Sequence, residues 1–299
     1  MWTYYALLLA YWVLGRLPCR VTYGIARLAA DTSYLLRADI RRNVQANMRQ
    51  VLGDEASERQ VRTAAREVVR NAARYYADLI RMPHLDLPRF CERYLTLEGL
   101  SYLQEAVAGD RGAVLASAHF GNPEISLQPL ALGIQVLALT EPLNPPQLMR
   151  LTQRLRAAHG HIFLPVSLNS AKEAVRRLKS GGIVAILVDR DIQGHGLPVP
   201  LCGRPTPIPA GAVELATRTG ADLVPCFVHR ERGFRYHAQI GPPVPLVRSA
   251  DTREDLRVNC ANLMARFEEH LCADPGQWVV LESVWPEHRA AVEPSSQAG

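Results

Sequence analysis

A histidine at the end of an apolar run is the residue of this sequence best placed to do chemistry. The run 113–118 leads directly to His119, and Glu124 follows five residues later, after Phe-Gly-Asn-Pro. An apolar run of this length predicts a buried strand. Asn122 is a preferred helix N-cap and Pro123 suits the first helical position, so a helix should begin here. His119 is therefore expected at the carboxyl end of a strand, where open α/β sheets place their chemistry.

The spacing His-x4-acid suits a general base and its partner. A carboxylate on the second ring nitrogen of a histidine holds one tautomer and stabilises the imidazolium that forms. A turn at Gly121 lets Glu124 reach His119, and we expect these two as the catalytic pair. Glycine also allows a close approach of the backbone to a ligand, and the N–H groups of residues 121–124 are expected to support an oxyanion. The alternative is a structural histidine beside a glutamate of a helix start.

Polar side chains also follow two later apolar runs. The run 134–140 is followed by Glu141, and the run 183–188 leads into Asp189, Arg190 and Asp191. The carboxyl ends of parallel strands meet at one edge of a sheet, so these residues and His119 are predicted to line one site.

The order of elements predicts an α/β fold with a mostly parallel central sheet flanked by helices, because apolar runs alternate with helical patterns. Strands are expected at 95–98, 113–118, 134–140, 162–166, 183–188, 223–228 and 234–240, and helices at 102–108, 123–132, 146–158, 171–180, 211–219 and from 252. Ser170 is expected to cap the helix at 171, and a Gly/Pro-rich loop is predicted at 194–211.

The first third reads as helical and basic. Residues 1–15 carry no charged side chain but two Trp and three Tyr, which favour a membrane–water interface. Ser57-x-x-Gln60 is a capping box that opens a helix ending near 82. Residues 16–74 hold 12 Arg against 6 Asp or Glu, and the rest of the chain is close to neutral. We expect a membrane-associated helix, interfacial or marginally spanning, next to a face that meets an anionic membrane surface.

The totals describe an ordinary globular protein of 299 residues, 48% hydrophobic and 21% charged. Six scattered cysteines form neither a disulfide framework nor a zinc motif, which predicts reduced thiols in a cytosolic environment. The basic region carries no glycine-rich or aromatic-rich nucleic-acid-binding motif, so no nucleic-acid partner is expected. We divide the chain into a hydrophobic helix at 1–20, a helical region at 21–90, a catalytic α/β domain at 91–290 and a disordered tail at 291–299.

Several segments, in order, resemble the lysophospholipid acyltransferase superfamily, in the branch of the lipid A lauroyl/myristoyl and the phosphatidylinositol mannoside acyltransferases. His119 to Glu124 is similar to its His-x4-acid motif, Asp189-Arg190-Asp191 to its Asp-Arg-Asp stretch, and Arg41 to Val44 also fits. The resemblance spans nearly all of residues 1–290. Pro123 departs from the usual Trp, and Cys202 from a usual aromatic residue.

The resemblance implies transfer of a fatty acyl chain from acyl-CoA or acyl carrier protein to a hydroxyl of a lysolipid or glycolipid, at the cytosolic face of the cytoplasmic membrane. It implies His119 as general base, Glu124 as its orienting group, and no metal or redox cofactor. By the same resemblance, either Arg154 or Arg156 belongs to the acceptor site. The implied substrate-binding residues are Gly121, Asn122, Glu141, Arg156, Asp189, Arg190 and Asp191.

Two other functions compete with this one. A non-catalytic, membrane-peripheral lipid-binding protein would keep the N-terminal helix and basic face without needing His119 and Glu124 together. A metal-dependent hydrolase would use His159-x-His161 with His119 and Asp189 as ligands. A serine hydrolase is disfavoured because the chain contains no Gly-x-Ser-x-Gly.

Overall fold

The sheet at the centre of the molecule is mostly parallel, as predicted. The computed structural model describes residues 1–285, without the side chains of Trp2, Thr3 and Ala131. Its seven-stranded sheet has the order β1-β9-β8-β2-β5-β3-β4. The pairing of β8 with β9 is antiparallel, and the other five pairings are parallel. The strands are β1 (Leu95–Glu98), β2 (Ala113–Ser117), β3 (Val136–Thr140), β4 (Ile162–Pro165), β5 (Ile183–Leu187), β8 (Asp222–Arg230) and β9 (Tyr236–Ile240). Because β2, β5 and β3 are neighbours, the segments that follow them meet at one edge.

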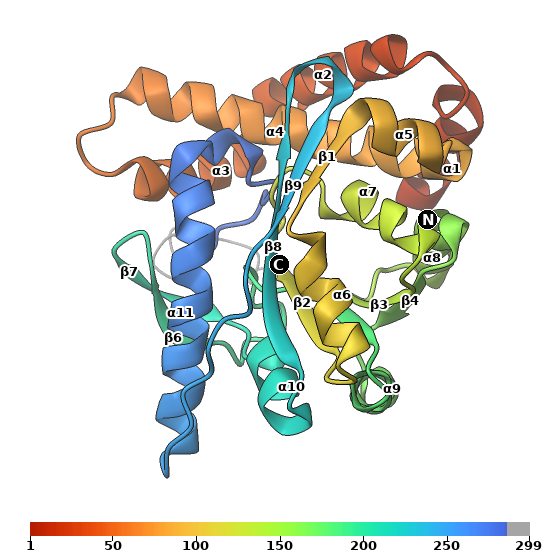
Figure 1. Cartoon of the computed structure of the whole chain (residues 1–299). Helices are drawn as coiled ribbons and strands as arrows, with labels where there is room; N and C mark the ends of the chain where they lie inside the picture. The colour runs from red at the N-terminus through yellow and green to blue at the C-terminus, as the bar shows by residue number, and fades with distance from the viewer. Residues whose placement is uncertain (286–299) are drawn as a thin grey trace.

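Helices cover both faces of this sheet. The later helices are α6 (Leu100–Ala108), α7 (Pro123–Leu127), α8 (Pro146–Arg156), α9 (Leu168–Lys179), α10 (Gly211–Thr219) and α11 (Thr252–Ala273). Alternate residues of β2 enter two cores: Val114 packs with residues of α9, α10 and α11, and Leu115 packs with residues of α6, α7 and α8. Figure 1 shows α11 on one side of the sheet and α6 and α7 on the other. A strand buried on both faces needs an unbroken apolar sequence, which is what 113–118 supplies.

The first third of the chain is helical, as predicted, and lies across the upper end of the sheet in Figure 1. It comprises α1 (Trp2–Leu14), α2 (Cys19–Leu36), α3 (Ala38–Leu52), α4 (Glu58–Arg81) and α5 (Leu87–Tyr94). The capping box at Ser57 and Gln60 is confirmed, with both reciprocal hydrogen bonds present. Within residues 1–285, none of the helices combines the length and the apolar character needed to cross a bilayer.

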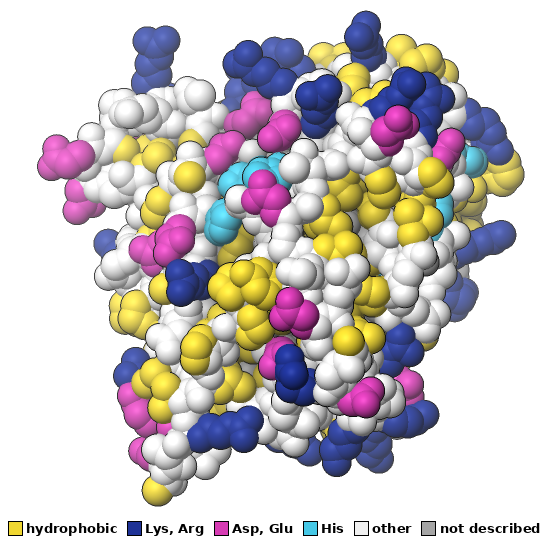
Figure 2. Space-filling view, viewed as in Figure 1, with side chains coloured by type: hydrophobic (Ala, Val, Ile, Leu, Met, Phe, Trp, Pro, Cys, Tyr) yellow, Lys and Arg dark blue, Asp and Glu magenta, His cyan; other side chains and the backbone are white. Residues whose placement is uncertain are grey.

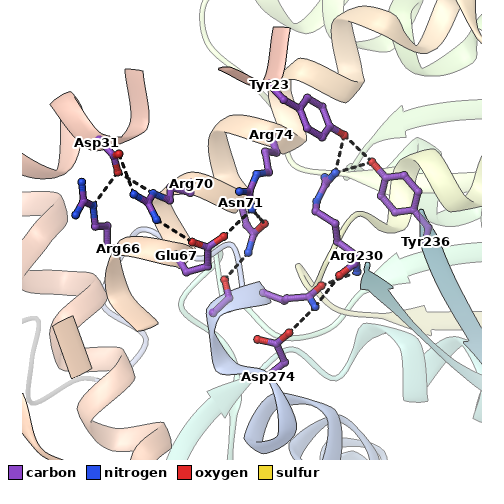
Figure 3. Close-up of polar contacts among 12 residues, drawn as sticks. Tyr23, Asp31, Arg66, Glu67, Arg70, Asn71, Arg74, Arg230, Tyr236 and Asp274 are labelled. Atoms are coloured by element: carbon purple, nitrogen blue, oxygen red, sulfur yellow. Dashed lines mark hydrogen bonds and ion pairs between the residues drawn. The ribbon is translucent and has the colours of Figure 1, made fainter. Parts of the chain in front are cut away.

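Polar networks tie these helices to each other and to the sheet (Figure 3). Asp31 of α2 accepts hydrogen bonds from Arg66 and Arg70 of α4, each at 2.8 Å. Further along α4, the buried Asp78 pairs with Arg230 of β8. Residues of α3 and α4 also join the same hydrophobic core as those of β2 and α11. The helical region therefore packs directly on the central sheet, while the proposed division at residue 90 stays a prediction.

Three local predictions need correction. The loop predicted at 194–211 contains an antiparallel hairpin of β6 (Leu197–Leu201) and β7 (Arg204–Ile208). Its four prolines face one another in two pairs, 198 with 207 and 200 with 205, at alternate register positions. A ladder bonds only every second pair, so these prolines occupy the pairs that need no N–H donor, and a proline-rich segment can form strands.

The helix predicted at 171–180 begins earlier, because Ser167 caps it and Ser170 completes the capping box. The helix predicted at 123–132 is α7 followed by a 3-10 turn at Gln128–Leu132, where Pro129 interrupts the α-helical bonding. The tail predicted as disordered lies outside the described residues.

Candidate active site

A cavity of about 720 Å³ opens at the carboxyl ends of β2, β3 and β5. His119, Glu124, Glu141 and Arg190 line its polar part. Its depth is apolar, formed by sheet residues and by the turn after α7: Leu97, Leu115, Leu127, Leu130, Ala138, Phe163, Ala185, Cys226, Val228, Ala238 and Ile240. Such a space has the dimensions and lining of a site for a long apolar ligand with its reactive end at the polar mouth.

His119 is held by Asp189, which corrects the predicted pairing. The Nδ1 atom of His119 lies 2.9 Å from Oδ1 of Asp189, and the backbone N–H of His119 donates to both carboxylate oxygens at 3.1 Å. The two residues follow the adjacent parallel strands β2 and β5, which brings them together across 70 residues of sequence. In this structure the His119 ring contacts Asp189, while Glu124 pairs with Arg156.

Asp189 is fully buried and remains a carboxylate. Trp278 donates its indole N–H to Oδ2 of Asp189 at 2.7 Å. Burial alone raises the pKa of Asp189, but the charge of His119 and the hydrogen bonds from His119 and Trp278 outweigh it and hold that pKa below its ordinary value of 3.8. A charged acceptor on Nδ1 fixes the proton there and leaves Nε2 as the basic nitrogen.

The segment that carries Trp278 also braces the turn after β2. Gly121 donates its N–H to the carbonyl of Gln277 at 2.9 Å, and Val279 donates to the carbonyl of His119 at 2.8 Å. The Gln277 side chain bonds the backbone of Arg230 in both directions, at 2.6 and 3.1 Å. No pattern in the sequence singles out Trp278, because a lone Trp in an apolar run carries no signal of a site.

Glu124 lies in the cavity wall with a different partner. Its oxygens take a two-pronged ion pair from Arg156, with N–O distances of 2.9 and 2.8 Å, and both side chains are about 10% exposed. The hydroxyl of Tyr75 on α4 lies 3.3 Å from the Arg156 guanidinium. Burial alone lowers the pKa of Arg156, but Glu124 and Tyr75 reverse this and raise it, so Arg156 stays charged.

Gly121 and Asn122 have structural contacts that account for their residue types. Gly121 has φ +63°, and a Cβ there would lie 1.9 Å from the carbonyl oxygen of Val228, so close packing on β8 requires glycine. Asn122 is buried; it caps α7 through the N–H of Ile125 and donates to Asp78 at 2.8 Å. Neither residue is among those that line the cavity. Fewer backbone N–H groups of residues 121–124 are available to an oxyanion than expected. The Gly121 N–H donates to the carbonyl of Gln277, and Pro123 has no N–H.

The residues predicted after β3 and β5 do meet. Arg190 lies 3.5 Å from Glu141 and also pairs with Glu282 of the C-terminal segment. The carboxylate of Asp191 accepts from the N–H groups of Gly194 and Gly196, at 2.9 and 2.8 Å, and shapes the following loop. All except Gly194 line the cavity. Their binding of substrate stays a prediction.

The ligand set of the metal-dependent alternative does not assemble. Nε2 of His159 lies 2.7 Å from the carbonyl of Met82, and His161 bonds the backbone of Val136 and Leu127 through its two ring nitrogens. Within residues 1–285, the structure gathers no three potential ligands around His119.

A carboxylate-oriented histidine at the mouth of a deep apolar cavity is suited to group transfer between a hydroxyl and a long-chain donor. The family model of the bacterial lipid A biosynthesis acyltransferases matches residues 1–286. The chain belongs to this family, which makes it an O-acyltransferase rather than a protein that only binds lipid.

Curated relatives agree with this assignment. The chain is 30% identical over 220 residues to proteins named phosphatidylinositol mannoside acyltransferase from Mycobacterium tuberculosis, strains CDC 1551 and H37Rv, covering 71% of this chain and 67% of theirs. A protein of the same name from Mycolicibacterium smegmatis is 28% identical over 218 residues, covering 71% of this chain and 69% of its own.

Proposed function

We propose that this enzyme transfers a fatty acyl chain from a thioester donor, acyl-CoA or acyl carrier protein, to a hydroxyl of a glycosylated membrane lipid, with His119 as general base. The observation that carries the proposal is the bond of 2.9 Å between His119 Nδ1 and the buried Asp189, at the mouth of the apolar cavity. In this proposal the cavity takes the acyl chain, and the thioester carbonyl lies beside His119 among the polar lining residues.

The reaction balances with the groups present. Nε2 of His119 removes the proton of the acceptor hydroxyl as its oxygen attacks the thioester carbonyl, and a C–O bond forms. The tetrahedral intermediate then collapses with cleavage of the C–S bond, and the leaving thiolate takes the proton back from His119. Asp189 stabilises the imidazolium between these steps. Arg190 is a candidate to bind phosphate of donor or acceptor, since its planar fork suits phosphate oxygens.

The exposed surface of the N-terminal helices supports a membrane-bound acceptor. The helices α1 and α2 expose apolar side chains, with Leu9, Leu28 and Leu36 66%, 70% and 78% exposed. Figure 2 shows basic side chains over the N-terminal helices, where all of them are arginines, with hydrophobic side chains between them. Three exposed apolar side chains, Tyr76, Val166 and Ile192, also line the cavity. This combination fits peripheral contact with an anionic bilayer.

Replacement of the base tests the proposal. His119→Ala should lower the rate of acyl transfer by about 10²–10⁴-fold, the usual contribution of a general base. His195→Ala, another histidine of the cavity lining, is the matched control and should change the rate less than about tenfold. Transfer by His119→Ala at the wild-type rate contradicts the proposed base.

The acceptor follows from mass spectrometry of lipids from cells with and without the protein. The relatives' names make a mannosylated phosphoinositide the first candidate, and a species that lacks one acyl chain in the absence of the protein identifies the acceptor. An unchanged glycolipid profile contradicts this choice of acceptor.

A further inference from the structure

We propose that Cys202, Glu268 and Cys272 form a zinc site that joins the tip of the β6–β7 hairpin to α11, apart from the acyl-transfer site. One potential ligand atom from each residue, two sulfurs and a carboxylate oxygen, lies within 4.8 Å of the others. Within residues 1–285 this is the one group of three or more His, Cys, Asp or Glu side chains so close together. Sequence spacing hides the group, because 66 residues separate Cys202 from Glu268.

The protein holds these ligands in place through contacts separate from the ligand atoms. Cys202 and Gly203 form the two-residue turn of the hairpin, both with positive φ, and Leu201 pairs with Arg204 across it. The Cys202 N–H donates to Glu268 at 3.0 Å, and its carbonyl accepts from Gln50 of α3 at 2.7 Å. The thiol is thus presented by a turn anchored on two helices.

The second half of the site is prearranged by helix geometry. Glu268 and Cys272 are four residues apart on α11, so their side chains lie on the same face of the helix. The Cys202 N–H engages one Glu268 oxygen and leaves the other for a cation. Cys272 is exposed, which gives an ion access from solvent, and Cys202 is half-buried.

The chemistry of this donor set selects zinc. Two thiolates with one carboxylate combine soft and hard donors, and Zn²⁺ accepts both in tetrahedral sites, with water as fourth ligand. Calcium and magnesium prefer sites made only of oxygen. Cys202 and Cys272 are both free thiols rather than partners in a disulfide.

The position of the site gives it a consequence for the cavity. His195 and Gly196 immediately precede the hairpin, Pro209 and Ala210 immediately follow it, and all four line the cavity. A cation that fixes the hairpin tip to α11 therefore restrains the part of the cavity wall formed by the residues at the two ends of the hairpin.

Metal titration of the reduced, metal-free, full-length protein tests the proposal. Cd²⁺ reports thiolate binding through its ultraviolet charge-transfer absorption, and Zn²⁺ should displace it at one equivalent. Cys202→Ser and Cys272→Ser should each weaken binding by about 100-fold or more, beyond the loss from a merely supporting group. Cys91→Ser, another partly buried thiol, is the control and should bind as wild type.

Melting curves of the metal-free variants separate loss of the site from loss of the fold. If Cys202→Ser is unfolded because the turn is disturbed, the metal affinity of the folded Cys272→Ser variant tests the proposal instead. A stoichiometry of zero, binding unaffected by both serine variants, or a Cys202–Cys272 disulfide in protein prepared with zinc each overturns the proposal.

Discussion

Two buried carboxylates near the cavity, those of Asp189 and Glu124, bond different kinds of side chain. Asp189 accepts hydrogen bonds from three N–H groups of His119 and Trp278, and in the proposed mechanism it supports the base. Glu124, five residues from His119 in sequence, instead neutralises Arg156 in the cavity wall. The carboxylate that contacts His119 is therefore the one 70 residues away in sequence, not the one five residues away. One carboxylate should therefore control rate, and the other should control stability.

Asp189→Asn should have the largest effect, a loss of roughly 10³–10⁴-fold in kcat, because an amide no longer stabilises the imidazolium or fixes the productive tautomer. Steady-state transfer from acyl-CoA measures it. The loss should match that of His119→Ala, and the double variant should lose no more than either single variant, since the pair acts as a unit. Additive losses contradict a shared role.

Glu124→Gln should act mainly on the fold. It leaves the buried guanidinium of Arg156 without a counter-charge, which costs about 3–5 kcal/mol in the free energy of unfolding. Urea unfolding measures this loss. The control is Glu124→Gln with Arg156→Gln, which should recover most of the stability because no buried charge remains. If Glu124→Gln keeps its stability yet loses as much rate as Asp189→Asn, the contrast between the two carboxylates is wrong.

Trp278→Phe should have a smaller effect on rate. It removes the hydrogen bond of 2.7 Å to Asp189 but keeps an aromatic ring in the core. A hydrogen bond to a charged group contributes about 1.5–3 kcal/mol, so we expect kcat to fall by roughly 10- to 150-fold. The same substitution in the Asp189→Asn background should change kcat little, and an equal loss there would show that Trp278 acts elsewhere.

The smallest expected effect is on the pH dependence of stability. The pKa of Asp189 is lower in the folded protein than its ordinary 3.8, so its ionised form stabilises the fold above that value. This stabilisation should be present at pH 5 and decline as the pH falls below 3.8 toward the folded pKa. The difference in unfolding free energy between wild type and Asp189→Asn measures it. A difference that grows with acidification contradicts the assigned direction.

Local sequence determined much of this protein. The strand 113–118 and the helix start at Asn122 and Pro123 followed from burial and capping, because both depend on neighbours along the chain. The parallel order of strands and the gathering of Glu141 and Arg190 at one edge followed from topology. The segment motifs were specific enough to indicate the acyltransferase family, which the family model confirmed.

Tertiary structure alone decided the partners within the site. Asp189 reaches His119 because β5 pairs with β2 in parallel register, and Trp278 reaches Asp189 because the chain returns to the sheet after α11. Packing over the whole core sets the register of the strands and the path of the chain after α11. The residues near His119 in sequence therefore do not predict either of them. The sequence determines which side chains are able to do chemistry. The folded sheet determines which of those side chains lie in contact.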